Sequence, residues 1–163
     1  MADLMDNAVK SGRINLCKII SFPVVHDYRG NLTFIEQYKH IPFELKRIYY
    51  LYDVPTGAVR GGHAHISLEQ VIIAVSGSFE VVIDDGYRKK SFFLNRPHYG
   101  LYIPPGMWRE LVNFSSNSVA LVLASEIYDE DDYIRDYDTF KRMVREGVWD
   151  ESDRRVAKKI TRL

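Results

Sequence analysis

Short apolar runs separated by turn residues occupy the chain from Leu16 to Ser125. The runs are rich in β-branched and aromatic residues, which favour strands. They fall at residues 18–25, 32–38, 46–54, 59–65, 70–75, 79–83, 88–94, 100–103, 109–114 and 119–125. Asp85-Gly86 stands between two of these runs and is a strong hairpin signal. Short strands at near-regular spacing, with no helix between them, predict an all-β antiparallel sandwich or barrel.

The pattern changes after Ser125. Residues 139–146 have the apolar spacing of a helix, with Asp138 in the position of an N-cap. The charged segment 150–163 is either a second short helix or a frayed end. We therefore divide the chain into an N-terminal lead-in at 1–15, a β domain at 16–137 and a C-terminal helical tail at 138–163.

Composition limits the classes of partner. The 163 residues are enough for one domain with a real core. Lys and Arg together number 22 and so do Asp and Glu, so no overall charge favours nucleic acid or a membrane surface. The chain has one cysteine, Cys17, which excludes an internal disulfide and fits a reducing compartment. No apolar run approaches the ~18 residues of a spanning helix. We expect a cytoplasmic protein that binds neither nucleic acid nor membrane.

The richest chemistry lies in the run at 59–65. His63 and His65 stand one residue apart, so on a strand their side chains share a face, with Cα atoms roughly 6.5 Å apart. Such a pair can bind a metal, transfer protons at neighbouring atoms of one substrate, or fill a core as hydrogen-bonded residues. Two histidines on one face directly after Gly61-Gly62 are an unusual choice for a core, which favours a functional role.

The wider spacing resembles a known superfamily. Gly57-x5-His63-x-His65-x4-Gln70-x6-Gly77 is similar to the first motif of the cupins, which have a double-stranded β-helix, or jelly-roll, fold. Metal-binding cupins have Glu in the position of Gln70.

Their second motif begins with Pro-x-Gly and supplies a further histidine. Here Pro104-Pro105-Gly106 leads to Arg109 in that position. A guanidinium has no free lone pair and stays protonated, so Arg109 cannot ligate a metal. A one-residue slip could offer the carboxylate of Glu69, but a fourth ligand would still be missing. We therefore expect no metal and favour an acid–base pair.

Neutral imidazoles suit proton transfer near pH 7, because their unperturbed pKa is ~6.5. His63 and His65 could serve a carbon and an adjacent oxygen of a sugar ring. Arg109, with a second arginine at Arg29 or Arg47, could stabilise enolate or phosphate charge.

Several motifs in series give a more specific resemblance. They are Arg29-Gly-Asn-Leu-Thr-Phe-Ile-Glu36, Ile41-Pro-Phe-Glu-Leu-Lys-Arg47-Ile-Tyr49-Tyr50, Arg60-Gly-Gly-His63-Ala-His65, Gly100-Leu-Tyr-Ile-Pro-Pro-Gly-Met-Trp108-Arg109-Glu110 and residues 123–137. In this order they resemble the dTDP-4-keto-6-deoxyglucose 3,4-ketoisomerases, which are metal-independent cupins of bacterial surface polysaccharide synthesis. The resemblance covers about residues 19–140.

The resemblance implies a reaction and a set of residues. The carbonyl moves from C4 to C3 of the dTDP-linked sugar through an enediol, without a cofactor. The product is a dTDP-3-keto-6-deoxyhexose on the way to a 3-amino-3,6-dideoxyhexose for O-antigen-type glycans. His63 and His65 are then the acid–base residues, and Tyr49 lies in the active site. The residues at Arg29 and Arg109 are tied to the choice between gluco and galacto products.

Other residues keep two interpretations. Arg60 contacts the nucleotide phosphates or lies on the barrel rim. Gln70 binds substrate or is a polar residue on the barrel wall. Trp108 stacks on a base or sugar, or packs in the core. Tyr49, with its neighbour Tyr50, could instead be aromatic packing. Residues 128–137, rich in Asp and Tyr, are read as a solvated connector rather than a cation site.

The expected partners are a dTDP-linked 4-keto-6-deoxyhexose and a second copy of the chain. A homodimer would bury a strand edge that is otherwise an aggregation hazard. Three alternatives remain open for the function. They are a sugar-nucleotide 3,5-epimerase, a non-catalytic sugar-nucleotide-binding cupin and a metal-dependent dioxygenase.

Overall fold

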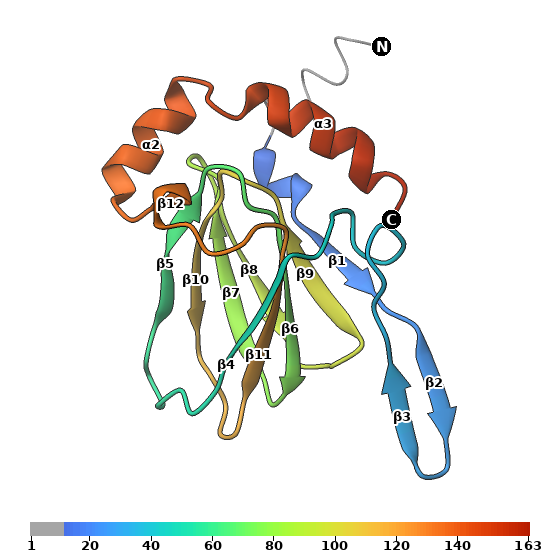
Figure 1. Cartoon of the computed structure of the whole chain (residues 1–163). Helices are drawn as coiled ribbons and strands as arrows, with labels where there is room; N and C mark the ends of the chain where they lie inside the picture. Colours follow the sequence, from blue (N-terminus) through green and yellow to red (C-terminus); the bar gives the residue numbers. More distant parts are fainter. Residues whose placement is uncertain (1–11) are drawn as a thin grey trace.

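The computed structural model describes residues 12–163, which form a jelly roll of two antiparallel sheets with helices across one end (Figure 1). The strands are β1 (Lys18–Ser21), β2 (Val24–Asp27), β3 (Gly30–Thr33), β4 (Arg47–Leu51), β5 (Arg60–His65), β6 (Gln70–Ser76), β7 (Phe79–Asp84), β8 (Lys89–Leu94), β9 (Tyr99–Ile103), β10 (Trp108–Val112), β11 (Val119–Ala124) and β12 (Tyr133–Ile134). The helices are η1 (Arg13–Leu16), η2 (Glu130–Asp132), α2 (Tyr137–Arg145) and α3 (Asp150–Ile160).

The two sheets have the strand orders β1-β9-β6-β11-β4 and β12-β5-β10-β7-β8. Strands that are adjacent in space are therefore mostly distant in sequence, as a jelly roll requires. The predicted jelly-roll fold with a short C-terminal helix is confirmed. In residues 12–163, no helix is long and apolar enough to span a membrane.

The strand predictions fail mainly near the N-terminus. The run at 18–25 is two strands, β1 and β2, interrupted at Phe22-Pro23, where proline offers no N–H to a ladder. The run at 32–38 leaves its strand after Thr33. The chain then forms a loop whose residues Ile41 and Phe43 are buried in the core.

Side chains of both sheets meet in one core. On β7, Phe79, Val81 and Ile83 are fully buried while Glu80 and Val82 are partly exposed, which is the alternation of a sheet with one covered face. β6 is buried throughout residues 70–74. Both of its faces are therefore covered, because successive side chains point to opposite sides.

The C-terminal segment is folded and packed. α2 begins after Asp136, whose side chain accepts a hydrogen bond of 2.8 Å from the Thr139 N–H, so the N-cap lies two residues before the predicted Asp138. Segment 150–160 is the helix α3 rather than a frayed end, and its Val156 and Ile160 belong to the core.

Arg13 joins both ends of the chain to the loops of the sheets. Its side chain is 7% exposed and pairs with Asp153 of α3. It also donates to the carbonyls of Asp85, at 3.2 Å, and Gly106, at 3.0 Å, and its guanidinium carbon lies 5.4 Å from the centre of the Trp149 ring. Residues 13 and 14, which the sequence assigned to a loose lead-in, are buried here. Residues 1–11 of that lead-in lie outside the described residues, and the division into three segments stays a prediction.

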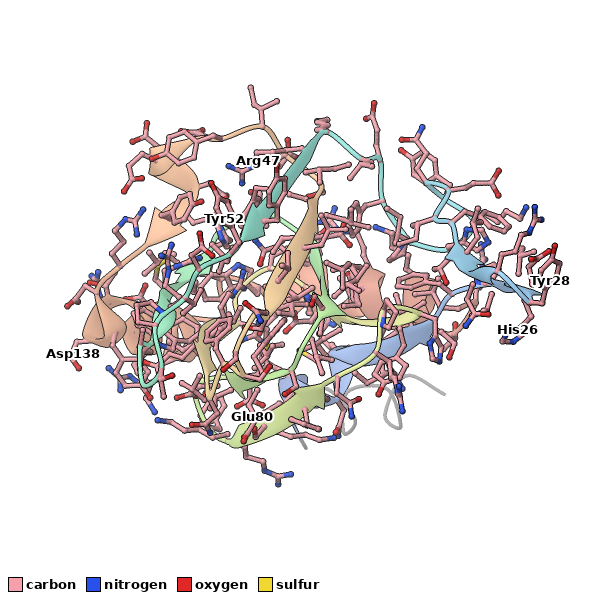
Figure 2. All side chains as sticks on the ribbon, turned by 90° about the horizontal axis from the view of Figure 1, so that it is seen from below. His26, Tyr28, Arg47, Tyr52, Glu80 and Asp138 are labelled. Carbon is pink, nitrogen blue, oxygen red and sulfur yellow. The ribbon has the colours of Figure 1, made fainter. Side chains whose placement is uncertain are left out.

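The β2–β3 hairpin projects away from the jelly roll (Figure 1). Figure 2 shows His26 and Tyr28 at its outer end, far from Arg47 on β4. The hairpin exposes apolar side chains, with Val25 at 52% and Leu32 at 57%.

Replacing Arg13 by alanine should destabilise the fold. The change leaves the buried Asp153 carboxyl without its partner and the Asp85 and Gly106 carbonyls without this donor. Removing one partner of a buried ion pair costs ~3–5 kcal/mol of unfolding free energy. Denaturant titration should show a loss of this size.

Arg155 on α3 is the matched control. Its side chain is 74% exposed, and its Nη1 lies 3.8 Å from Glu151 Oε1. Arg155→Ala should leave the unfolding midpoint nearly unchanged. Equal losses from the two substitutions would contradict a buried anchor at Arg13.

Candidate active site

A cavity of about 320 Å³ opens between the two sheets. β4 contributes Arg47 and Tyr49, β6 contributes Gln70, β5 contributes His63, and β10 contributes Arg109. Tyr49 is on the inner side of β4 whereas Tyr50 is 59% exposed, as strand alternation requires. The cavity thus gathers polar side chains from strands that are distant in sequence.

The pairing of β5 with β10 brings the key residues together. His63 is opposite Arg109 in the register, and the ladder then shifts so that Glu110 is opposite Gly61. Gly61 has φ +83°, and a Cβ there would stand 2.8 Å from the Arg109 carbonyl oxygen. Only glycine allows this close approach of the two strands.

Arg109 is a buried cation held by neutral groups. The residue is only 2% exposed. Its Nη1 donates to Gln70 Oε1 at 2.8 Å, and its Nη2 donates to the Met107 carbonyl at 2.7 Å. Gln70 Nε2 in turn donates to the Tyr49 hydroxyl at 2.9 Å. Burial lowers the pKa of Arg109 to about 10, so it remains charged at neutral pH. Within residues 12–163 it forms no ion pair, and its Nε is buried without a hydrogen-bond partner. The cavity therefore carries positive potential suited to a developing negative charge.

The two histidines are neutral at physiological pH. Burial, and then the nearby charge of Arg109, lowers the pKa of His63 to about 3. The pKa of His65 is lowered to about 4, mainly by burial, although Asp132 opposes the change. The two ring centres are 4.8 Å apart and the rings are nearly perpendicular. Each ring therefore offers one nitrogen lone pair at pH 7.

The surroundings of the two rings differ. His63 lines the cavity. His65 is fully buried behind it, with Nδ1 3.0 Å from Asp132 Oδ2. The backbone also holds His65, because the Gly106 N–H donates to its carbonyl at 2.8 Å.

The segment before α2 completes the site. β12 pairs with β5 so that Tyr133 is opposite His65. The ring of Tyr133 lies 4.9 Å from that of His63 and 4.4 Å from that of His65, and Arg135 packs over it at 4.5 Å. The sequence interpretation of residues 128–137 as a connector missed Asp132 and Tyr133. One sequence signal could have found them, because residues 123–137 are among the motifs that resemble the ketoisomerases.

Most predicted site residues come together. His63, Tyr49, Arg47, Arg60, Gln70 and Arg109 line the cavity, and His65 lies directly behind it. Two predicted substrate contacts lie elsewhere in this chain.

Trp108 precedes Arg109 on β10 and so points out of the jelly roll, where its ring is 5.2 Å from that of Tyr137 and 5.8 Å from that of Phe140. The structure thus shows the packing alternative for Trp108. Arg29 stands on the exposed hairpin turn, where its Nε donates to Asp27 at 2.7 Å, outside the cavity of its own chain.

The donor set does not resemble a metal centre. Among residues 12–163, no group of three or more His, Cys, Asp or Glu side chains is arranged to hold a metal ion. The place of a further ligand beside His63 is taken by the guanidinium of Arg109, which cannot ligate.

Comparison with known proteins gives consistent matches. A family model described as FdtA: WxcM-like, C-terminal matches residues 15–145. A curated protein of Aneurinibacillus thermoaerophilus, TDP-4-oxo-6-deoxy-alpha-D-glucose-3,4-oxoisomerase, is 47% identical over 127 residues, covering 78% of this chain and 91% of that protein.

Solved structures match over a similar span. A 3,4-ketoisomerase from Helicobacter canadensis has 53% identity and a TM-score of 0.77, covering 79% of this chain and 97% of that one. A mutant of the 3,4-ketoisomerase QdtA from Thermoanaerobacterium thermosaccharolyticum, in complex with TDP-4-keto-6-deoxyglucose, has 42% identity and a TM-score of 0.78, covering 80% and 94%.

The lowered histidine pKa values predict an acid-sensitive fold. The unfolded chain protonates these rings near pH 6.5, whereas the folded chain keeps them neutral until about pH 4 and 3. Their contribution to stability is complete above pH 6.5 and is lost as the pH falls toward the folded values. Denaturant unfolding at pH 7, 6, 5 and 4 should show decreasing unfolding free energy.

His63→Asn should flatten this pH dependence, since it removes one of the two groups. His40→Asn, at a position outside the cavity, should retain the wild-type slope. An unchanged slope in His63→Asn would show that His63 is not held neutral by the fold.

Proposed function

The chain belongs to the FdtA-like family of sugar 3,4-ketoisomerases, and we propose that it moves the carbonyl of dTDP-4-keto-6-deoxyglucose from C4 to C3. The observation that carries the proposal is the neutral His63 beside the buried, unpaired Arg109 in one cavity. A base that is unprotonated at pH 7 can remove a proton next to a carbonyl. A fixed cation beside it stabilises the oxyanion that results.

The steps balance within the substrate. His63 takes the proton from C3, and the electron pair forms the C3=C4 bond as the C4 carbonyl oxygen becomes negative and gains a proton. The C3 hydroxyl then loses its proton, the C3 carbonyl forms, and C4 receives a proton. C3 is oxidised as C4 is reduced, so the conversion is an isomerisation. His65 is the second acid–base residue in this scheme.

Arg109 and Tyr49 act through one connected chain of hydrogen bonds. Gln70 accepts from Arg109 and donates to Tyr49, so both of its amide atoms are engaged. Its role in the proposal is to orient these two groups around the sugar rather than to bind the sugar itself. Desolvation raises the pKa of Tyr49, which keeps its hydroxyl protonated and able to donate.

The remaining arginines of the cavity suit the diphosphate. Arg47 and Arg60 line the cavity together with Arg135. Arg47 has its Nε and Nη2 buried without partners in the described chain, so these donors are available to an anion. We assign Arg47 and Arg60 to the dTDP moiety, since guanidinium groups bind phosphate oxygens in a bidentate manner.

His63→Asn should abolish turnover while preserving binding. A positioned base contributes ~10²–10⁴-fold to the rate, so kcat should fall by at least that factor. Proton NMR with dTDP-4-keto-6-deoxyglucose in deuterated water measures the reaction, and titration with dTDP measures binding. His40→Asn is the control for a histidine outside the cavity.

The same experiment separates the alternatives. An isomerase relocates the ketone and places deuterium at C4, whereas a 3,5-epimerase exchanges C3 and C5 and keeps the C4 ketone. A sugar-nucleotide-binding cupin would bind without either exchange. Exchange at C5 with an unmoved carbonyl would overturn the proposed function.

We also propose that the chain works as a homodimer. β4 ends its sheet in the described chain and exposes Ile48 at 55% and Tyr50 at 59%. A groove of about 520 Å³, lined by the hairpin and the outer face of the sheet, adds to this apolar surface. A second copy is the occupant that would cover the open edge and the hairpin together. The predicted contact of Arg29 with substrate then requires the hairpin of one copy to reach the cavity of the other.

Ile48→Asp should weaken this association, because it places a charge within the apolar surface at the β4 edge. Sedimentation at micromolar concentration should show a dimer for the wild type and a monomer for the variant. Glu80→Gln, on the other sheet, is the control. A monomeric wild type would refute the homodimer without touching the assignment of His63.

A further inference from the structure

Asp132 is held beside His65 by several hydrogen bonds. Its Oδ2 lies 3.0 Å from His65 Nδ1, and its Oδ1 accepts from the Ser67 N–H at 2.7 Å. The Asp132 carbonyl accepts from the Ile66 N–H at 2.9 Å. Both ends of the residue are therefore tied to the turn that follows β5, and the carboxylate cannot rotate away from the imidazole without breaking these bonds.

The charge of Asp132 fixes the direction of its bond to His65. Burial would raise the pKa of Asp132, but hydrogen bonds from His65 and from backbone N–H groups lower it below the usual range. An ionised carboxylate can only accept hydrogen bonds. Nδ1 of the neutral His65 must therefore carry the proton, and Nε2 carries the lone pair.

The opposite edge of the ring is left with an open acceptor. Nε2 of His65 is buried and has no hydrogen-bond partner among the described residues. The ring lies against those of His63 and Tyr133, both of which line the cavity. A buried acceptor without a donor destabilises the fold, so its presence calls for an explanation, and a catalytic role provides one. If Nε2 gains a proton during the reaction, the imidazolium forms next to an anion that is already in place.

We propose that Asp132 is a positioning residue that fixes the tautomer of His65 and stabilises its protonated form during turnover. The kinetic part of this inference rests on the proposed ketoisomerase function, whereas the tautomer does not. Asp132 acts through His65 and touches no reacting atom. The arrangement has the same logic as other carboxylate–histidine pairs, in which the acid orients the ring and supports its charge.

Asp132→Asn distinguishes this role from a structural one. The amide oxygen can still accept from the Ser67 N–H, but the amide nitrogen would then face Nδ1 and donate to it. His65 would be forced into the other tautomer with little change in shape. Asp132→Ala removes both interactions, and Asp131→Asn, at the exposed neighbouring carboxylate, is the matched control.

The first readout is kinetic. Asp132→Asn should lower kcat by ~10²–10⁴-fold, with KM and dTDP affinity nearly unchanged, because the wrong tautomer blocks proton transfer without altering the cavity. Asp131→Asn should match the wild type. A kcat of Asp132→Asn within about threefold of the wild type would overturn the proposal.

The second readout is the tautomer itself. Nitrogen-15 NMR of the full chain labelled at histidine, with the His65 signal assigned by its loss in His65→Asn, should show Nδ1–H in the wild type and Nε2–H in Asp132→Asn. An Nε2–H tautomer in the wild type would overturn the proposal even if the variant fails to fold. If the wild type does not isomerise the ketosugar, the proposed function fails, while this spectrum still decides the assignment of Asp132.

Discussion

A buried guanidinium without a counter-ion dominates the electrostatics of the candidate active site. Removing Arg109 from water costs free energy that its hydrogen bonds to Gln70 and the Met107 carbonyl offset only in part. An aspartate or glutamate beside it would relieve the cost but would also cancel its field. The neutral partners keep that field directed into the cavity. The same field helps to keep His63 unprotonated, so in the proposed mechanism Arg109 acts both on the base and on the oxyanion.

The jelly roll makes this arrangement feasible because it joins the cation and the base across one strand pair. Arg109 and His63 are opposite each other in the β5–β10 ladder, and Gly61 allows the close approach of the two backbones. Each side chain is held by a strand rather than by a loop, so its position depends on the whole sheet. This precision suits a reaction in which protons move between adjacent atoms of one sugar ring.

The sequence was sufficient to predict the features of the site that depend on strand alternation and motif spacing. Alternation placed His63 and His65 on one face, and the motif register placed Arg109 near them. Alternation also implies that Trp108 turns outward, because it precedes the inward Arg109 on the same strand, but the sequence interpretation left both of its alternatives open. Asp132 was missed because it meets His65 across 67 residues of chain, and an acidic stretch before a helix has the composition of a solvated connector. Arg13 was missed for a similar reason, since its partner Asp153 is 140 residues away.

A single residue, Gly106, links the N-terminal and C-terminal helices to the candidate active site through its backbone. The N–H of Gly106 donates to the His65 carbonyl, and its own carbonyl accepts from Arg13, which also holds α3 through Asp153. The next residue, Met107, supplies the carbonyl that anchors Arg109. The terminal helices therefore help to position the site, and they are not independent additions to the jelly roll. Consider a chimera that takes its first or last helix from a relative. It would alter the geometry of the candidate active site unless residues 13, 106 and 153 were exchanged as a set.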